Sequence, residues 1–195
     1  NMAPASSLNA PSGYTLLVDK LSGGAGPYSK FYVGLKIYGK NTGSSIQHIL
    51  KRYIYVEAGT NGFGGTNLTI SWGAGSVSLT TTGYYAEYDV TWKDLSYGGT
   101  EPVQYKDCCA YYSGSSYYET GIDTFTYTAP KGYTVTYNSN GGSGSMSTDT
   151  TPYGFGYVTK ANTFTRTGYT WKGWNEASDG SGTDWTSWVG QSWTW

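Results

Sequence analysis

The sequence predicts an all-β protein whose larger, N-terminal part is an antiparallel β-sandwich. Three observations lead to this prediction: short runs that alternate between polar and apolar residues, Gly-rich turns between the runs, and no long amphipathic helical pattern. The 195 residues include 29 Gly, 21 Tyr and 8 Trp, a mixture typical of strands joined by tight turns. A chain of this length is long enough for two small domains that each bury a core.

The first elements are a leader and two strands. Residues 1–13 are small, polar and proline-containing, so we expect a flexible leader. Strands are expected at 14–18 and at 31–38, and the second has the clearest alternation. We expect its core face to consist of Phe31, Val33, Leu35 and Ile37.

Residues 44–58 are ambiguous, because Ile46, Ile49 and Leu50 fit a helical turn whereas residues 53–56 require a strand. We favour a strand and leave open a short helical turn before it. Further strands are expected at 68–72, 77–79, 84–92, 103–112 and 117–127. In the strand at 84–92, alternation places on the core face Tyr84, Ala86, Tyr88, Val90 and Trp92.

Pro130 disfavours the continuation of a central strand and predicts a domain boundary. The predicted organisation is therefore a leader at 1–13, a sandwich at 14–129 and a smaller module at 130–195. The module begins with a strand whose inward face carries Tyr133, Val135 and Tyr137.

Several motifs of this module occur in a specific order. The strand leads into the turn Asn140-Gly141-Gly142, and after a polar loop Tyr169 and Trp171 alternate with Thr170 and Lys172 as in a half-buried strand. The remaining motifs are Val135-Thr136-Tyr137-Asn138, the run Ala161-Asn162-Thr163-Phe164-Thr165-Arg166-Thr167-Gly168-Tyr169, Gly173-Trp174-Asn175 and Asp179-Gly180-Ser181-Gly182-Thr183.

These motifs resemble the Listeria-Bacteroides repeat, or internalin B repeat, of surface and secreted proteins of Gram-positive bacteria and of some of their phages. The resemblance implies a small β-grasp-like module that acts as a spacer or adhesive element and has no catalytic residues to carry over. The sequence departs from the family at 185–195, which leaves open that the module is truncated. The alternating Tyr and Thr strands of the N-terminal part also resemble, loosely, β-sandwich modules of Gram-positive phage tail proteins.

Charge and composition argue against several partners. Charged residues are only 13% and the formal net charge is −1, so we expect neither nucleic acid nor a membrane surface as partner. A histidine-dependent hydrolase is not expected, because His48 is the only histidine and lies in a polar segment predicted to be weakly structured. We therefore expect a protein that is not an enzyme and carries no metal or other cofactor.

Three small clusters have a chemical and a simpler interpretation. Cys108 and Cys109 are adjacent, and we favour two free thiols over a vicinal redox switch. Whether the two cysteines are oxidised stays open. Glu87 and Asp89 share one strand face and could form a calcium or acid-base pair, but because the other face of this strand is apolar we favour a solvated surface. The loop at 179–184 lacks the acidic spacing of a calcium loop and is expected to be a turn.

Exposed aromatic side chains are the candidate ligand-binding residues. Four tyrosines flank residues 113–116, so a hairpin tip would carry more tyrosines than can face the core. Tyrosine suits sugar rings and protein partners, although β-surfaces also tolerate it without a ligand. Trp185 and Trp188 are further candidates, and with Trp193 and Trp195 they either fill the module or form a subunit contact. The hairpin candidates are Tyr111, Tyr112, Tyr117 and Tyr118.

The function expected from the sequence is a structural or adhesive virion protein of a Gram-positive phage, in a tail or fibre. The start at Asn1-Met2 has no secretory signal pattern, so with Met2 as natural start we expect synthesis in the host cytoplasm. Expected partners are other virion subunits or cell-wall carbohydrate, and a homo-oligomer stays open. The alternatives are a fragment of a bacterial surface adhesin and an ancillary carbohydrate-binding module of an enzyme.

Overall fold

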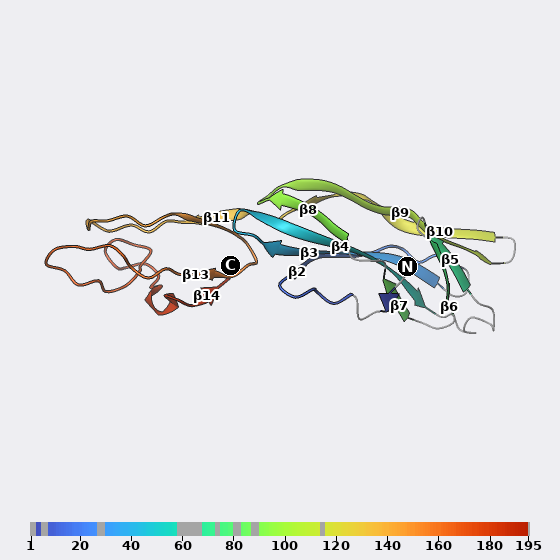
Figure 1. Ribbon diagram of the computed structural model, residues 1–195, viewed down its shortest axis with the longest axis horizontal. Helices are drawn as coiled ribbons and strands as arrows, with labels where there is room; N and C mark the ends of the chain where they lie inside the picture. The colour runs from blue at the N-terminus through green and yellow to red at the C-terminus, as the bar shows by residue number, and fades with distance from the viewer. Residues whose placement is uncertain are drawn as a thin grey trace. The chain divides into compact units, whose positions relative to one another are not determined.

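The computed structural model describes residues 3–4, 8–26, 30–57, 68–72, 75–79, 83–86, 90–113 and 116–194. These residues form β-strands and turns without an α-helix, which confirms the predicted all-β class. None of the described segments forms a helix with the length and hydrophobicity needed to cross a bilayer. The labelled elements (Figure 1) are β1 (Ala3–Pro4), β2 (Thr15–Leu21), β3 (Lys30–Asn41), β4 (Ser45–Glu57), β5 (Leu68–Trp72), β6 (Gly75–Leu79), β7 (Gly83–Ala86), β8 (Val90–Ser96), β9 (Thr100–Ser113), β10 (Ser116–Thr128), β11 (Gly132–Val135), β12 (Asp149–Pro152), β13 (Tyr157–Val158), the 3₁₀ turn η2 (Thr186–Trp188) and β14 (Ser192–Trp193).

The chain divides into two compact units. Unit 1 consists of Asn1–Leu95 and Thr100–Ala129, and unit 2 consists of Ser96–Gly99 and Pro130–Trp195. The short turn between β8 and β9 is therefore grouped with unit 2, where the Gly98 amide donates to the Pro130 carbonyl over 3.0 Å.

Unit 1 contains two antiparallel sheets. The first has the strand order β1-β7-β4-β3-β2, and β8 also pairs with β4; the second has the order β10-β9-β5-β6. β9 and β10 lie alongside β3 and β4 (Figure 1), and apolar side chains of both sheets meet in one core. The buried members of this core are Phe31, Val33, Leu35, Ile37, Ile54, Val103, Ile122, Tyr127 and Ala129.

β3 follows the alternation read from the sequence. The four side chains predicted on its core face are all 0% exposed, which confirms that prediction. Gly34 lies between two of them, on the opposite face of the sheet and directly across from Tyr53 of β4. A Cβ atom at Gly34 would lie 2.0 Å from the Tyr53 ring, so the ring covers a position that only glycine leaves open.

The ambiguous stretch at 44–58 is a strand from Ser45 to Glu57. β4 pairs with β3 from Ile46 to Glu57 without a register shift, so no helical turn precedes it. Over so short a segment, the positions of the apolar residues fit a helix as well as a strand. The continuous pairing of β4 with β3 shows that the segment is a strand.

His48 does not lie in a weakly structured segment, and that prediction is wrong. The side chain is 0% exposed, and its Nδ1 donates to the Lys93 carbonyl over 2.9 Å while its Nε2 accepts from the Tyr127 hydroxyl over 2.7 Å. Burial raises the pKa of Tyr127 to about 12, so the hydroxyl keeps its proton and can donate. The polar neighbours of His48 in sequence gave no sign that β4, β8 and β10 would enclose this ring.

The strand predicted at 84–92 corresponds to two labelled strands, β7 and β8, which both pair with β4. Trp92 packs against the core as predicted, whereas the side chains of the other four predicted core residues lie outside the described part. Glu87 and Asp89 also lie outside the described residues.

Parts of the predicted leader take part in unit 1. β1 pairs with β7, the Leu8 carbonyl accepts from the Tyr38 hydroxyl, and the Asn9 carbonyl accepts from Lys51 Nζ over 3.1 Å. The leader is therefore attached to the first sheet at these points, and its flexibility elsewhere stays a prediction.

Unit 2 contains two small antiparallel sheets, β11-β12 and β13-β14. The predicted turn after β11 has positive φ at Asn140 (49°) and Gly141 (83°), as a tight hairpin turn requires. The Gly142 amide donates back to the Ser139 carbonyl over 3.0 Å and closes this turn.

The strand predicted at Tyr169–Lys172 is wrong. Tyr169 is 67% exposed and Trp171 is 43% exposed, and within the described residues these positions pair with no strand. Gly168 has φ of 79°, and the Tyr169 amide donates to the Arg166 carbonyl, so the chain turns there instead of extending. The Arg166 guanidinium lies 4.1 Å from the centre of the Tyr169 ring, which keeps this ring at the surface.

Candidate functional site: an aromatic pocket in unit 2

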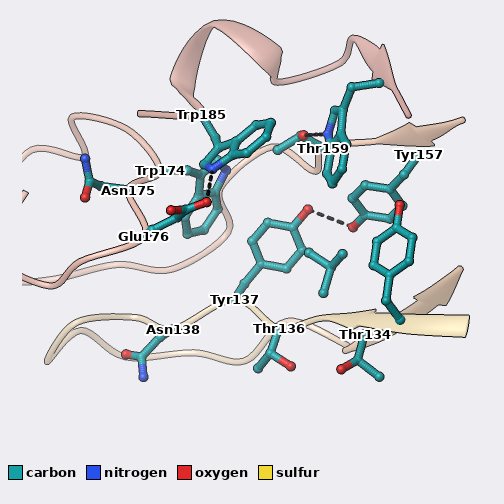
Figure 2. Close-up of a pocket in the computed structure, with 13 residues that line it drawn as sticks. Thr134, Thr136, Tyr137, Asn138, Tyr157, Thr159, Trp174, Asn175, Glu176 and Trp185 are labelled. Atoms are coloured by element: carbon teal, nitrogen blue, oxygen red, sulfur yellow. Dashed lines mark hydrogen bonds between the residues drawn. The ribbon is translucent and has the colours of Figure 1, made fainter. Parts of the chain in front are cut away.

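Unit 2 contains a pocket of about 380 Å³ between β11 and the segments that carry β13 and β14. We call it the aromatic pocket, because tyrosine and tryptophan rings face one another across it (Figure 2). The lining residues are Tyr133, Thr134, Val135, Thr136, Tyr137, Asn138, Tyr157, Thr159, Trp174, Asn175, Glu176, Trp185 and Trp193.

The alternation of β11 and the residues after it supplies one wall. Tyr133, Val135 and Tyr137 are partly buried, whereas the residues between them are exposed. Figure 2 shows Thr134 and Thr136 pointing away from the rings that face Tyr137. The predicted inward face of this segment is therefore confirmed, and it faces the pocket.

A chain of hydrogen bonds fixes Tyr137. Its hydroxyl accepts from the Lys160 amide over 2.9 Å and lies 2.8 Å from the Tyr157 hydroxyl. The Tyr157 hydroxyl donates to Asp149 Oδ2 over 2.7 Å, so Tyr137 is the donor in the bond between the two tyrosines. Lys160 Nζ donates to the other oxygen of Asp149 over 2.8 Å.

These hydrogen bonds and the burial of the same side chains shift the pKa values of two groups, Tyr157 and Asp149. Burial, together with the bonds to Tyr137 and Asp149, raises the pKa of Tyr157 far above its usual range. Burial also opposes the ionisation of Asp149, but hydrogen bonds from Lys160 and Tyr157 outweigh it and lower the pKa of that carboxyl group. The Lys160–Asp149 ion pair therefore lies beside the hydrogen-bonded hydroxyls of Tyr157 and Tyr137.

Each tryptophan of the pocket donates its indole N–H to a defined acceptor. Trp174 Nε1 donates to the Lys160 carbonyl over 2.9 Å, and Trp193 Nε1 donates to Thr159 Oγ1 over 2.7 Å. Trp185 Nε1 donates to Glu176 Oε1 over 2.9 Å. These bonds hold the ring planes in place without a ligand.

The rings form two contact groups. The Tyr137 and Trp174 centroids are 4.8 Å apart, and the Trp185 and Trp193 centroids are 4.9 Å apart. Tyr157 meets Trp193 edge to face at 5.6 Å. The rings of the pocket are only partly buried apart from Tyr157, so ring surface stays accessible from the pocket.

The loop that carries Glu176 is closed by side chains as well as backbone. Asn175 donates from Nδ2 to the Gly180 and Gly182 carbonyls and accepts at Oδ1 from the Ala177 and Gly182 amides. The Glu176 amide donates to the Thr183 carbonyl over 3.1 Å. The asparagine of the sequence motif Gly173-Trp174-Asn175 thus organises the loop that places Glu176 beside Trp185.

The loop at 179–184 is a turn, as predicted. Asp179 Oδ1 accepts from the Ser181 amide and hydroxyl, and these bonds lower the pKa of the Asp179 carboxyl group. Asp184 Oδ1 accepts in the same way from the hydroxyl and the amide of Thr186, and these bonds lower the pKa of the Asp184 carboxyl group. Nowhere in the described part of the chain do three or more His, Cys, Asp or Glu side chains gather as metal ligands would.

Of the two tryptophans predicted to bind a ligand, only one lies at the aromatic pocket. Trp185 lines the pocket, whereas Trp188 is 41% exposed in η2 and is not among the lining residues. In the hairpin, β9 and β10 pair Tyr112 with Tyr117 and Tyr111 with Tyr118. The side chains of these four tyrosines, and those of Cys108 and Cys109, lie outside the described part, so the hairpin surface and the thiol state stay predictions.

Sequence reasoning missed Tyr137, Trp174 and Glu176 as site residues. Alternation placed Tyr137 on an inward face, and Trp174 belongs to a quoted motif, but neither signal says which residues meet across the module. Glu176 gave no signal, because its position depends on the loop that Asn175 closes.

The comparisons with known proteins concern unit 2. Neither a curated protein nor a solved structure matches the chain significantly. The likeness of the N-terminal part to phage tail modules therefore stays a prediction. Residues 133–191 match the family model of the Listeria-Bacteroides repeat domain, which supports the resemblance read from the C-terminal motifs, and repeats of this family occur in bacterial surface and extracellular proteins.

Proposed function

We propose that this chain is a non-enzymatic adhesive protein whose unit 2 binds carbohydrate of a Gram-positive cell wall through the aromatic pocket. The observation that carries the proposal is the set of partly exposed rings of Tyr137, Trp174 and Trp185 around one pocket. Sugar rings have apolar faces that stack on such side chains and hydroxyl groups that bond to the polar atoms between them.

The dimensions and the order of the pocket support this proposal. Its volume of about 380 Å³ falls within the range of about 300–1,000 Å³ that is usual for small-ligand pockets. The indole N–H bonds hold the rings before a ligand arrives, which lowers the entropic cost of binding. The buried His48 supports a non-enzymatic role, because both ring nitrogens are engaged with Lys93 and Tyr127.

The narrower proposal concerns the setting, a tail or fibre of a Gram-positive phage virion with other virion subunits as further partners. The occurrence of the repeat in surface and extracellular proteins supports an external location. Peptide mass spectrometry of purified virions tests the narrower proposal, since peptides of the chain are expected there. Recovery of the peptides only from a bacterial wall fraction would contradict the virion setting and favour the surface-adhesin alternative. Recovery with a catalytic domain on the same polypeptide would favour the ancillary-module alternative.

The binding proposal is tested with fluorescently labelled protein on a panel of Gram-positive cells, with and without enzymatic removal of wall polysaccharide. We expect binding that is lost on stripping and is reduced about tenfold or more by Trp185→Ala, which removes a stacking surface. Trp188→Ala is the matched control, because Trp188 lies outside the pocket lining. Equal binding by the folded Trp185→Ala variant and the control would contradict the proposal.

The tyrosine hairpin is tested in the same assay as a second surface. A variant with Tyr112→Ala and Tyr117→Ala is expected to bind cells more weakly while it stays folded. Unchanged binding by this variant would remove the hairpin as a ligand surface and leave the pocket.

A further inference from the structure

We infer that the aromatic pocket selects uncharged sugars over anionic glycans, and that Glu176 sets this preference. The inference rests on the proposed function, since it assumes that the pocket takes carbohydrate. It adds the chemical class of the ligand and the residue that determines it.

Glu176 is the only charged residue among those that line the pocket. Its Oε1 accepts from Trp185 Nε1 over 2.9 Å, and its Oε2 accepts no hydrogen bond from the described residues. Figure 2 shows the carboxylate lying next to Trp185 and in front of Trp174. An open acceptor is therefore held next to two rings on which a ligand would stack.

A carboxylate accepts hydrogen bonds and cannot donate them. A ligand that satisfies Oε2 must bring a donor, and the hydroxyl and amide groups of neutral sugars are donors of this kind. Charge-assisted hydrogen bonds are stronger than neutral ones, so this acceptor favours a sugar that presents a hydroxyl or acetamido group at that position.

The negative charge of Glu176 is not compensated within the pocket. Lys160, whose backbone contacts the pocket rings, directs Nζ to Asp149 at 2.8 Å and to Ser147 at 2.8 Å, and it is not a lining residue. The Lys160–Asp149 pair is neutral as a whole, which leaves Glu176 as the net charge. Glu176 is exposed, so a uronate or phosphate group in the pocket would place like charges side by side with partial screening by solvent.

The loop keeps Glu176 from turning away. The Glu176 amide is bonded to Thr183, the following amide of Ala177 is bonded to Asn175 Oδ1, and the carboxylate is bonded to Trp185. Relief of charge repulsion by reorientation of Glu176 would cost the bond to Trp185. The residue therefore acts on ligand choice through a fixed charge.

The test uses the full chain and calorimetric titration with two probes of matched length, oligomers of N-acetylglucosamine and oligomers of galacturonic acid, at one ionic strength. We expect the neutral oligomer to bind on the order of tenfold or more tightly than the anionic one. Glu176→Gln keeps an acceptor for Trp185 and removes the charge, so it is expected to strengthen binding of the anionic oligomer about tenfold.

Asp179→Asn is the matched control, because it makes the same charge change in the same loop outside the pocket lining. It is expected to leave both affinities unchanged. Equal affinity of the native chain for the two oligomers, or equal effects of the two substitutions, would overturn the inference while leaving carbohydrate binding intact. Absence of binding by either oligomer, in a protein that also fails to bind cells, would overturn the proposed function itself.

Discussion

At the scale of single residues, hydrogen bonds decide how the aromatic side chains of unit 2 are oriented. The hydroxyl of Tyr137 is the clearest case, because it both accepts from the Lys160 amide and bonds to Tyr157. The ring of the same residue contacts Trp174. Its polar and apolar contributions can therefore be separated by one substitution.

Tyr137→Phe keeps the ring and removes the hydroxyl. We expect unit 2 to lose about 1–3 kcal/mol of unfolding free energy, because the partly buried amide of Lys160 loses its acceptor. Urea denaturation followed by tryptophan fluorescence measures the loss. Tyr153→Phe is the control, since Tyr153 is 49% exposed and its change is expected to be near zero; an equal loss in both variants would contradict the role of the Tyr137 hydroxyl.

His48 gives a prediction for pH. Burial lowers its pKa in the folded chain, although the bond to Lys93 and the charge of Asp94 act in the opposite direction. The unfolded chain, with a His pKa of about 6.5, therefore binds the proton more readily than the folded chain. The stability that neutral His48 supports is complete above about pH 6.5 and declines as the pH falls towards the folded pKa.

Equilibrium unfolding of unit 1 by circular dichroism from pH 7.5 to pH 5 measures this decline. His48→Gln removes the only histidine and is expected to flatten the profile in this range. The carboxyl groups of Asp149, Asp179 and Asp184, whose pKa values are lowered, lose their contribution only at lower pH. A profile of unchanged slope in the variant would contradict the prediction.

At the scale of elements, Gly34 shows how one strand depends on its neighbour. Gly34→Ala would push a methyl group into the Tyr53 ring, where a Cβ would lie 2.0 Å from the nearest ring atom. We expect a loss of about 1–3 kcal/mol, typical of overpacking. Gly23→Ala is the control, since nothing lies within 4 Å of its Cβ position. Equal midpoints in urea for the two variants would show that the ring moves away freely.

Strands with a continuous partner were predictable from the sequence, and elements without one were not. The alternation at 31–38 succeeded because β3 lies between β2 and β4 and one face is fully buried. The same pattern at Tyr169–Lys172 failed, because alternation describes a face but does not supply a ladder partner. The turn at Gly168 directs that segment away from pairing.

The site was less predictable than the fold for a related reason. Trp185 was identified because tryptophans are dense near the C-terminus, but its partners Trp174 and Glu176 come from a loop whose closure depends on Asn175. Composition shows where aromatic residues are frequent in the sequence. A pocket also requires contacts that hold their side chains apart around an open space, and composition does not show these contacts. Those contacts are side-chain hydrogen bonds across a loop, between Asn175 and Gly182 and between Trp185 and Glu176, and alternation along a strand does not predict them.

At the scale of the whole molecule, two compact units predict two unfolding transitions. Six of the eight tryptophans, from Trp171 onwards, belong to unit 2, so tryptophan fluorescence reports mainly on that unit. Gly34→Ala is expected to lower the transition seen by circular dichroism, to which the many strands of unit 1 contribute most, and to leave the fluorescence midpoint unchanged. A shared shift of both signals would contradict independent unfolding.

The central claim is that unit 2 binds wall carbohydrate in the aromatic pocket, and indole N–H resonances in an NMR titration test its location directly. Purified wall polysaccharide is added to the ¹⁵N-labelled chain, with the indole signals assigned by single Trp→Phe variants. We predict that the signals of Trp174 and Trp185 shift in a saturable way while that of Trp188 does not. Saturable binding that moves only Trp188, Trp72 or Trp92 would place the ligand elsewhere and contradict the account.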